Sequence, residues 1–231
     1  MLENYFSYII RQPVISTPVF LNLLPILLIW RKRAYNDKLL LILFVYLILK
    51  LGVDLVMLDL ASQRKNNVIY YNASIPVRYI LTSWMYYYEF DSKLHRRWLL
   101  ASWPLFLAFS LWDSFHTNPS MSDLNNHNVV LYSGTIESLL ILFWIMLYFY
   151  NTIRTLKIPN LLAYPFFWVC SGLLLYYSSF VFIAPVLHYA AKWDQWMDIG
   201  TLDYIPYVFE SVSLILFSIG IAQYRDKSYA K

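Results

Sequence analysis

The sequence is divided into apolar runs of about 20 residues, each bounded by charged or polar residues, and this pattern constrains the fold more than any other feature. The hydrocarbon core of a bilayer is about 30 Å thick, which a helix of roughly 20 apolar residues spans. Of the 231 residues, 59% are apolar and only 14% are charged, against about 45–50% and 25% in soluble domains. The pattern therefore predicts an all-α, polytopic membrane protein and excludes a soluble enzyme.

Seven runs are predicted to cross the bilayer as a single helical bundle that takes up residues 1–231. The predicted spans are residues 14–30, 39–60, 68–90, 98–115, 129–150, 166–187 and 205–224. The segment before the first span has no basic leader and no cleavage site of small residues, so it is not expected to be a signal peptide. Its apolar residues Leu2, Tyr5, Phe6, Ile9 and Ile10 are expected to form a short helix at the membrane surface.

The distribution of basic residues predicts the topology. Lysine and arginine in short loops stay on the cytoplasmic side of a membrane. With seven spans, one side holds most of the basic residues: Arg31, Lys32, Arg33, Lys38, Lys93, Arg96, Arg97, Arg154, Lys157, Arg225, Lys227 and Lys231. The other side holds Arg11, Arg64, Lys65 and Lys192. The N-terminus is therefore predicted to lie outside and the C-terminus inside.

Ionisable residues within the predicted spans are candidate site residues, because each costs about 2.5–3.5 kcal/mol to insert at the centre of a bilayer. They are Lys50, Asp54, Arg78, Glu137 and Glu210. At 1.5 Å per residue, the two cations fall near mid-bilayer and the three carboxylates fall in the outer half. By contrast, Asp59 and Asp113 fall near the outer boundary, where water is expected to solvate them.

The spacing of these charges predicts some of their pairs. Lys50 and Asp54 are four residues apart and share one helix face, so they can pair within their own helix. Arg78 can reach Glu137 or Asp54 if the second, third and fifth spans converge. Two cations against three carboxylates leave one carboxylate unpaired, protonated or matched by a cationic ligand. The five residues are interpreted as an outward-facing ligand pocket; a purely structural network and a transport or proton pathway remain the alternatives.

Several functions are not expected from the residues present. The last span has no lysine for a retinal Schiff base, and the four histidines lack the spacing of a metal site. No nucleophile motif or phosphate-binding glycine loop occurs, so neither enzymatic activity nor a cofactor is expected. The net charge of +4 is explained by topology, and no nucleic-acid partner is expected.

Residues 164–178 read YPFFWVCSGLLLYYS, and residues 214–221 read LILFSIGI. The first stretch resembles the penultimate helix of a group of bacterial seven-helix sensor regions found with histidine kinases, in which a Pro, Phe-Trp, Gly-Leu and Tyr-Ser pattern recurs. The second is similar to the final span of that group. Because the sequence has no catalytic domain, the resemblance implies a stand-alone member in the inner membrane of a bacterial cell.

The sequence as a whole favours a receptor-like or accessory membrane protein that binds a small polar or charged ligand. The predicted inner loops are too short for an output domain, so a signal is expected to pass to a separate protein, such as a membrane-bound sensor kinase. A small-solute or ion-coupled transporter and a structural assembly factor are the alternative functions. The uncharged inner halves of the spans, for example residues 39–48 and 140–150, argue against the transporter.

Overall fold

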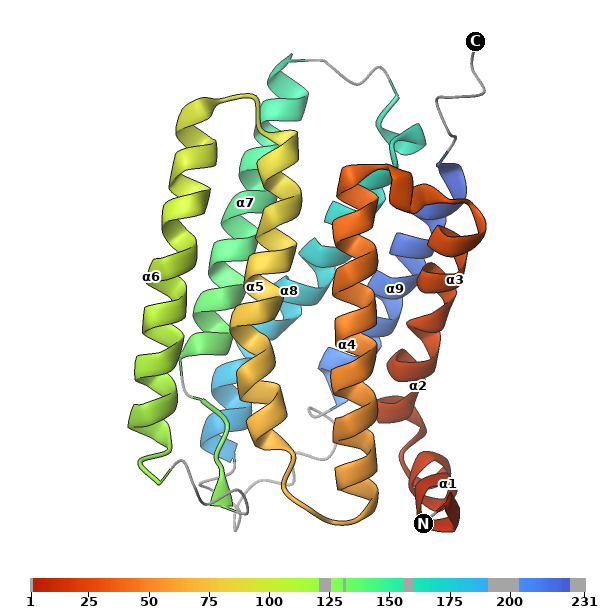
Figure 1. The fold of residues 1–231 in the computed structure, drawn as a ribbon, viewed down its shortest axis with the longest axis vertical. Helices are drawn as coiled ribbons and strands as arrows, with labels where there is room; N and C mark the ends of the chain where they lie inside the picture. The colour runs from red at the N-terminus through yellow and green to blue at the C-terminus, as the bar shows by residue number, and fades with distance from the viewer. Residues whose placement is uncertain (1, 121–125, 131, 156–159, 191–203, 225–231) are drawn as a thin grey trace.

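The protein is a bundle of long, roughly parallel and antiparallel α-helices, shown in Figure 1. The computed structural model describes residues 2–120, 126–130, 132–155, 160–190 and 204–224. The helices are α1 (Leu2–Arg11), α2 (Pro13–Leu21), α3 (Leu23–Arg31), α4 (Lys38–Ser62), α5 (Val68–Glu89), α6 (Lys93–Thr117), α7 (Ser133–Thr155), α8 (Pro165–Ala190) and α9 (Ile205–Gln223). Short 3-10 helices occur at Ala34–Asn36 and Leu161–Ala163. Every regular element in these described ranges is helical, as predicted.

Within the described ranges, five helical stretches are long and apolar enough to cross a membrane by length and composition. They are Pro13–Arg31, Lys38–Ser62, Ser133–Thr155, Pro165–Ile183 and Ile205–Gln223. The chain is therefore a membrane protein. Helices α5 and α6 have the length to span, with 22 and 25 residues, but their tyrosine, serine and basic residues make them less apolar.

The first predicted span is a broken helix. Asn22 separates α2 from α3, and Pro18 and Pro25 lie on either side of it. Each proline lacks a backbone N–H and so removes one hydrogen bond from the helix ladder. The fully buried Asn22 side chain donates a hydrogen bond of 3.0 Å to the carbonyl of Leu47 in α4. The break thus supplies a polar contact that holds the first span against the second.

The N-termini of two helices are capped by aspartate side chains, which accept from backbone N–H groups that have no partner in the helix. Asp37 caps α4 by accepting from Leu39 and Leu40, at 2.9 and 3.2 Å. Asp113 caps α7 from a different helix, α6: its Oδ2 accepts from the backbone N–H groups of Tyr132 and Ser133, at 3.0 and 2.7 Å. The expectation that water solvates Asp113 was wrong, because the residue is fully buried.

The α8–α9 pair makes the most extensive contact between elements in the described chain. Two glycines allow the close approach. A Cβ added at Gly172 would lie 2.9 Å from the carbonyl oxygen of Ser213, and one added at Gly220 would lie 2.6 Å from that of Pro165. Packing between the last two helices therefore explains why glycine stands at both positions.

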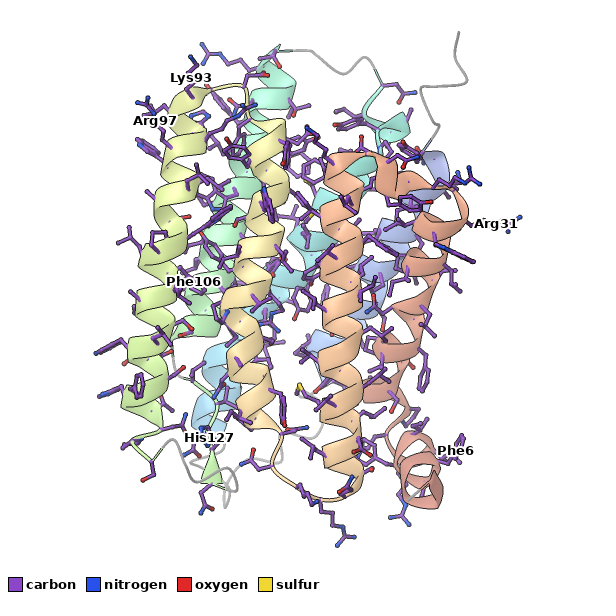
Figure 2. All side chains as sticks on the ribbon, viewed as in Figure 1. Phe6, Arg31, Lys93, Arg97, Phe106 and His127 are labelled. Atoms are coloured by element: carbon purple, nitrogen blue, oxygen red, sulfur yellow. The ribbon has the colours of Figure 1, made fainter. Side chains whose placement is uncertain are left out.

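The two ends of the bundle differ in charge. Figure 2 shows Arg31, Lys93 and Arg97 at one end, and Phe6 and His127 at the other. The ends are called the basic end and the His127 end below. Between the middle of the bundle and the basic end, the interior is a dense layer of mostly apolar and aromatic side chains, in which the small polar side chains of Thr82 and Ser83 are also buried. It contains the buried residues Leu43, Leu47, Met85, Tyr86, Tyr148, Phe166 and Phe217. The ring of Phe166 lies 5.4 Å from that of Tyr86 and 5.1 Å from that of Tyr148.

Candidate functional site

A cavity of about 560 Å³ lies in the half of the bundle toward the His127 end, and four of the five predicted site residues line it. Helices α4 and α5 form its walls, with α8 and α9 behind them (Figure 1). Lys50 is the central residue of α4, and Arg78 lies near the centre of α5. The charged lining consists of Lys50, Asp54, Arg78 and Glu210. The volume of the cavity is typical of a small-molecule site.

The first part of the site is a triad in which one lysine contacts two carboxylates. Lys50 Nζ lies 2.5 Å from Asp54 Oδ2, the pair that the spacing predicts. The same ammonium group also contacts Glu210 from α9. The sequence did not predict this second contact, because it depends on how α4 and α9 pack. One cation between two carboxylates leaves the triad with one excess negative charge when all three groups are ionised.

The second part is a buried ion pair between Arg78 of α5 and Glu137 of α7. The guanidinium donates two hydrogen bonds, from Nη2 to Oε2 at 2.8 Å and from Nε to Oε1 at 3.3 Å. Such a two-point contact fixes the geometry of both side chains. Helices α5 and α7 therefore converge as the pairing required, and Arg78 selects Glu137 and not Asp54.

Glu137 lies behind the cavity, as the only predicted site residue that does not line it. Its side chain is 1% exposed, against 13% for Arg78. The hydroxyl of Tyr177 in α8 donates to Glu137 Oε1 at 3.1 Å. Glu137 thus holds α5, α7 and α8 together, and its position argues for a structural role behind the site.

Aromatic side chains form much of the remaining wall. They are Tyr46, Tyr70, Tyr71, Tyr176, Phe180 and Tyr207. The guanidinium carbon of Arg78 lies 5.3 Å from the centre of the Tyr71 ring, which is within the range of a cation–π contact. Tyr70 and Tyr71 occur near the start of a predicted span, where tyrosine is typical of the membrane interface, whereas the structure places them in the cavity wall. No signal in a single sequence separates these two positions.

The two triad carboxylates are the most accessible anionic groups in this cavity. The side chain of Asp54 is 21% exposed and that of Glu210 is 12% exposed. Among the described residues, no group of three His, Cys, Asp or Glu side chains lies close enough to hold a metal ion. The arrangement of excess negative charge with aromatic rings around it can bind an organic cation, because ring faces and carboxylates both attract positive charge.

A second, larger cavity of about 980 Å³ lies at the basic end. Its lysines are engaged in contacts that fix the bundle. Lys32 Nζ contacts the carbonyl of Ala222 and lies 3.2 Å from that of Tyr224, so it neutralises the C-terminal end of α9. Lys38 Nζ lies 5.9 Å from the centre of the Tyr88 ring. The cavity at the His127 end, with its excess charge, is therefore the candidate site.

Compared with known protein families, with curated proteins and with solved structures, the chain matches none.

Proposed function

We propose that the protein is a seven-span membrane receptor whose cavity binds a positively charged organic ligand. The observation behind this proposal is the triad, in which Lys50 contacts both Asp54 and Glu210 and leaves one carboxylate in excess. Uncompensated charge is costly in a membrane, and a cationic ligand would compensate it. The aromatic residues of the wall support the same ligand class.

In the proposed topology, α5 and α6 span the membrane together with the five more apolar stretches. The exposed side of α6, away from the bundle interior, supports the proposal that this helix spans the membrane. Its apolar side chains Trp98, Leu105, Leu111, Trp112 and Phe115 are each more than half exposed, which suits contact with lipid. The basic end would then face the cytoplasm, in keeping with the distribution of basic residues.

Alkaline phosphatase fusions test this topology, since the enzyme is active only outside the cytoplasm. We expect activity for a fusion after Asn125 and none for fusions after Ala34 or Lys93. The Lys93 fusion is decisive, because residue 93 would lie outside if α5 and α6 did not cross the membrane. Activity there would contradict seven spans. Matched fusions to green fluorescent protein should give the opposite pattern.

Binding without transport is supported by the apolar layer between the cavity and the basic end. A carrier needs polar groups along its whole path, whereas this layer contains fully buried Leu43, Leu47 and Met85. The loops at the basic end are short: α5 ends at Glu89 and α6 begins at Lys93. We therefore propose that a separate membrane protein, such as a sensor kinase, reads the state of the helices when ligand binds.

Thermal unfolding of the purified protein tests the ligand class. We expect hexyltrimethylammonium to raise the melting temperature and hexanoate, which has a similar chain but a negative head, to leave it unchanged. A ligand at 100 times its Kd adds about 2.7 kcal/mol to the free energy of unfolding. Asp54→Asn and Glu210→Gln should each abolish the shift, because each removes the excess charge. Asp59→Asn is the matched control on α4, since Asp59 does not line the cavity.

Two outcomes would overturn the proposal. If hexyltrimethylammonium gives no shift with the unaltered protein, or an equal shift with all three variants, the cavity is not a cation site. Uptake of hexyltrimethylammonium into proteoliposomes that depends on Asp54 would identify a carrier and contradict the receptor. The permanent charge of this probe prevents uptake through lipid alone.

A further inference from the structure

Both walls of the cavity include residues that are exposed on the side of the bundle. On α4, the exposed apolar residues Leu41, Val45, Ile48 and Leu49 follow helical spacing and form a stripe, and Leu49 also lines the cavity. On α5, Tyr70, Ala73 and Val77 are exposed and line the cavity too. Leu49 and Val77 are 47% and 45% exposed although both lie near the middle of their helices. The cavity therefore opens sideways, between α4 and α5.

The His127 end of the cavity is partly covered by the segment before α7. Val129 and Val130 line the cavity there. The side chain of Asn72 accepts from the N–H of Val130 at 3.2 Å and donates to the carbonyl of Asn128 at 2.9 Å. Asn118, the residue that follows α6, exchanges two more hydrogen bonds with Asn128, at 2.7 and 3.0 Å. This end of the cavity is thus closed over in part by a hydrogen-bonded segment, whereas the opening between α4 and α5 is lined by apolar side chains.

We infer that the ligand is a single-chain amphiphile with a cationic head, which reaches the site from the bilayer. The inference rests on the proposed cation site and adds the source and shape of the ligand. The head lies against Asp54 and Glu210, and the apolar chain leaves between α4 and α5 into the hydrocarbon core. A long-chain amine or alkylammonium compound has this chemistry.

The depth and composition of the site support an amphiphile over a water-soluble amine. Asp54 lies eight residues before the end of α4, which is about 12 Å along the helix, so the site is below the level of the lipid headgroups. Between the charged residues and the bilayer the walls are apolar, with Val53, Met57 and Leu81 in addition to the exposed residues. A phospholipid is disfavoured, since its phosphate would bring negative charge toward the excess carboxylate.

Variants that obstruct the lateral opening test the inference without touching the charged residues. Ala73→Phe adds a ring on the α5 side of the opening, and Leu49→Trp adds one on the α4 side. Ala101→Phe is the matched control, because Ala101 is exposed on α6 and does not line the cavity. Binding of labelled dodecyltrimethylammonium and of tetramethylammonium is measured with each protein in lipid nanodiscs. The ratio of variant to unaltered Kd removes the contribution of partitioning into lipid, which is the same for every protein.

We expect Ala73→Phe and Leu49→Trp to raise the Kd for dodecyltrimethylammonium at least tenfold, and Ala101→Phe to change it less than twofold. The Kd for tetramethylammonium, which has no chain to place in the opening, should change less than twofold in all three variants. Equal effects on both probes, or no effect on either, would overturn lateral entry while the cation site stands. A failure of both probes to bind the unaltered protein would instead contradict the cation site itself.

Discussion

Arg78→Ala is expected to lower the free energy of unfolding by about 3–5 kcal/mol, because it leaves a buried carboxylate without its cation. Glu137 is 1% exposed and, of its hydrogen bonds to described residues, would retain only the one from Tyr177. Thermal or denaturant unfolding in a mild detergent measures the loss. Arg97→Ala, on an exposed residue of α6 (Figure 2), is the control and should change stability by less than about 0.5 kcal/mol.

A double variant separates loss of the ion pair from loss of packing. In Arg78→Met with Glu137→Gln, neither charge remains, a side chain of similar length fills the space of Arg78, and the amide oxygen can still accept from Tyr177. We expect the double variant to recover at least half of the stability that Arg78→Ala loses. If Arg78→Ala is as mild as Arg97→Ala, Arg78 and Glu137 do not form a buried pair.

The second large effect is expected at Asp113, where the side chain organises the start of α7. Its Oδ2 accepts from the N–H groups of Tyr132 and Ser133 and from the Ser133 hydroxyl, at 3.0, 2.7 and 2.5 Å. Asp113→Ala leaves these three donors without this acceptor, at about 1–3 kcal/mol for each donor that is buried. We expect several kcal/mol of destabilisation, measured by thermal unfolding in the same detergent.

The same substitution should also disturb the site, since Glu137 follows Ser133 by four residues, or about one helical turn. A frayed α7 would release Arg78 from its two-point contact. Asp59→Ala is the matched control: Asp59 is partly exposed and accepts from the side chain of Gln63, the residue that follows α4. Equal, small effects of Asp113→Ala and Asp59→Ala would show that water replaces the lost acceptor at both positions.

Local patterns in the sequence were sufficient to predict where the helices lie. Each predicted span overlaps a helix or, for the first span, a pair of helices, and the ends differ by a few residues. The differences have local causes: α6 begins at Lys93, five residues before the predicted residue 98, because basic residues are good helix formers although they are not apolar. The break at Asn22 follows from two prolines, each of which removes a hydrogen bond from the helix. A hydropathy pattern does not register this effect.

The sequence by itself determined the class of protein and one ion pair, because both depend on residues close together in the chain. Apolar runs must be helical in lipid, because their backbone N–H and C=O groups have no other hydrogen-bond partners there. Lys50 and Asp54 share a helix face however the helices pack against one another. Only the tertiary structure decided that Lys50 also contacts Glu210, that Arg78 selects Glu137, and that Asp113 is buried. These contacts depend on which helices are neighbours and how each is rotated about its axis. The sequence of an apolar helix in lipid says little about which helices are its neighbours or how it is rotated about its axis. The cavity and its opening between α4 and α5 could therefore be found only in the packed structure.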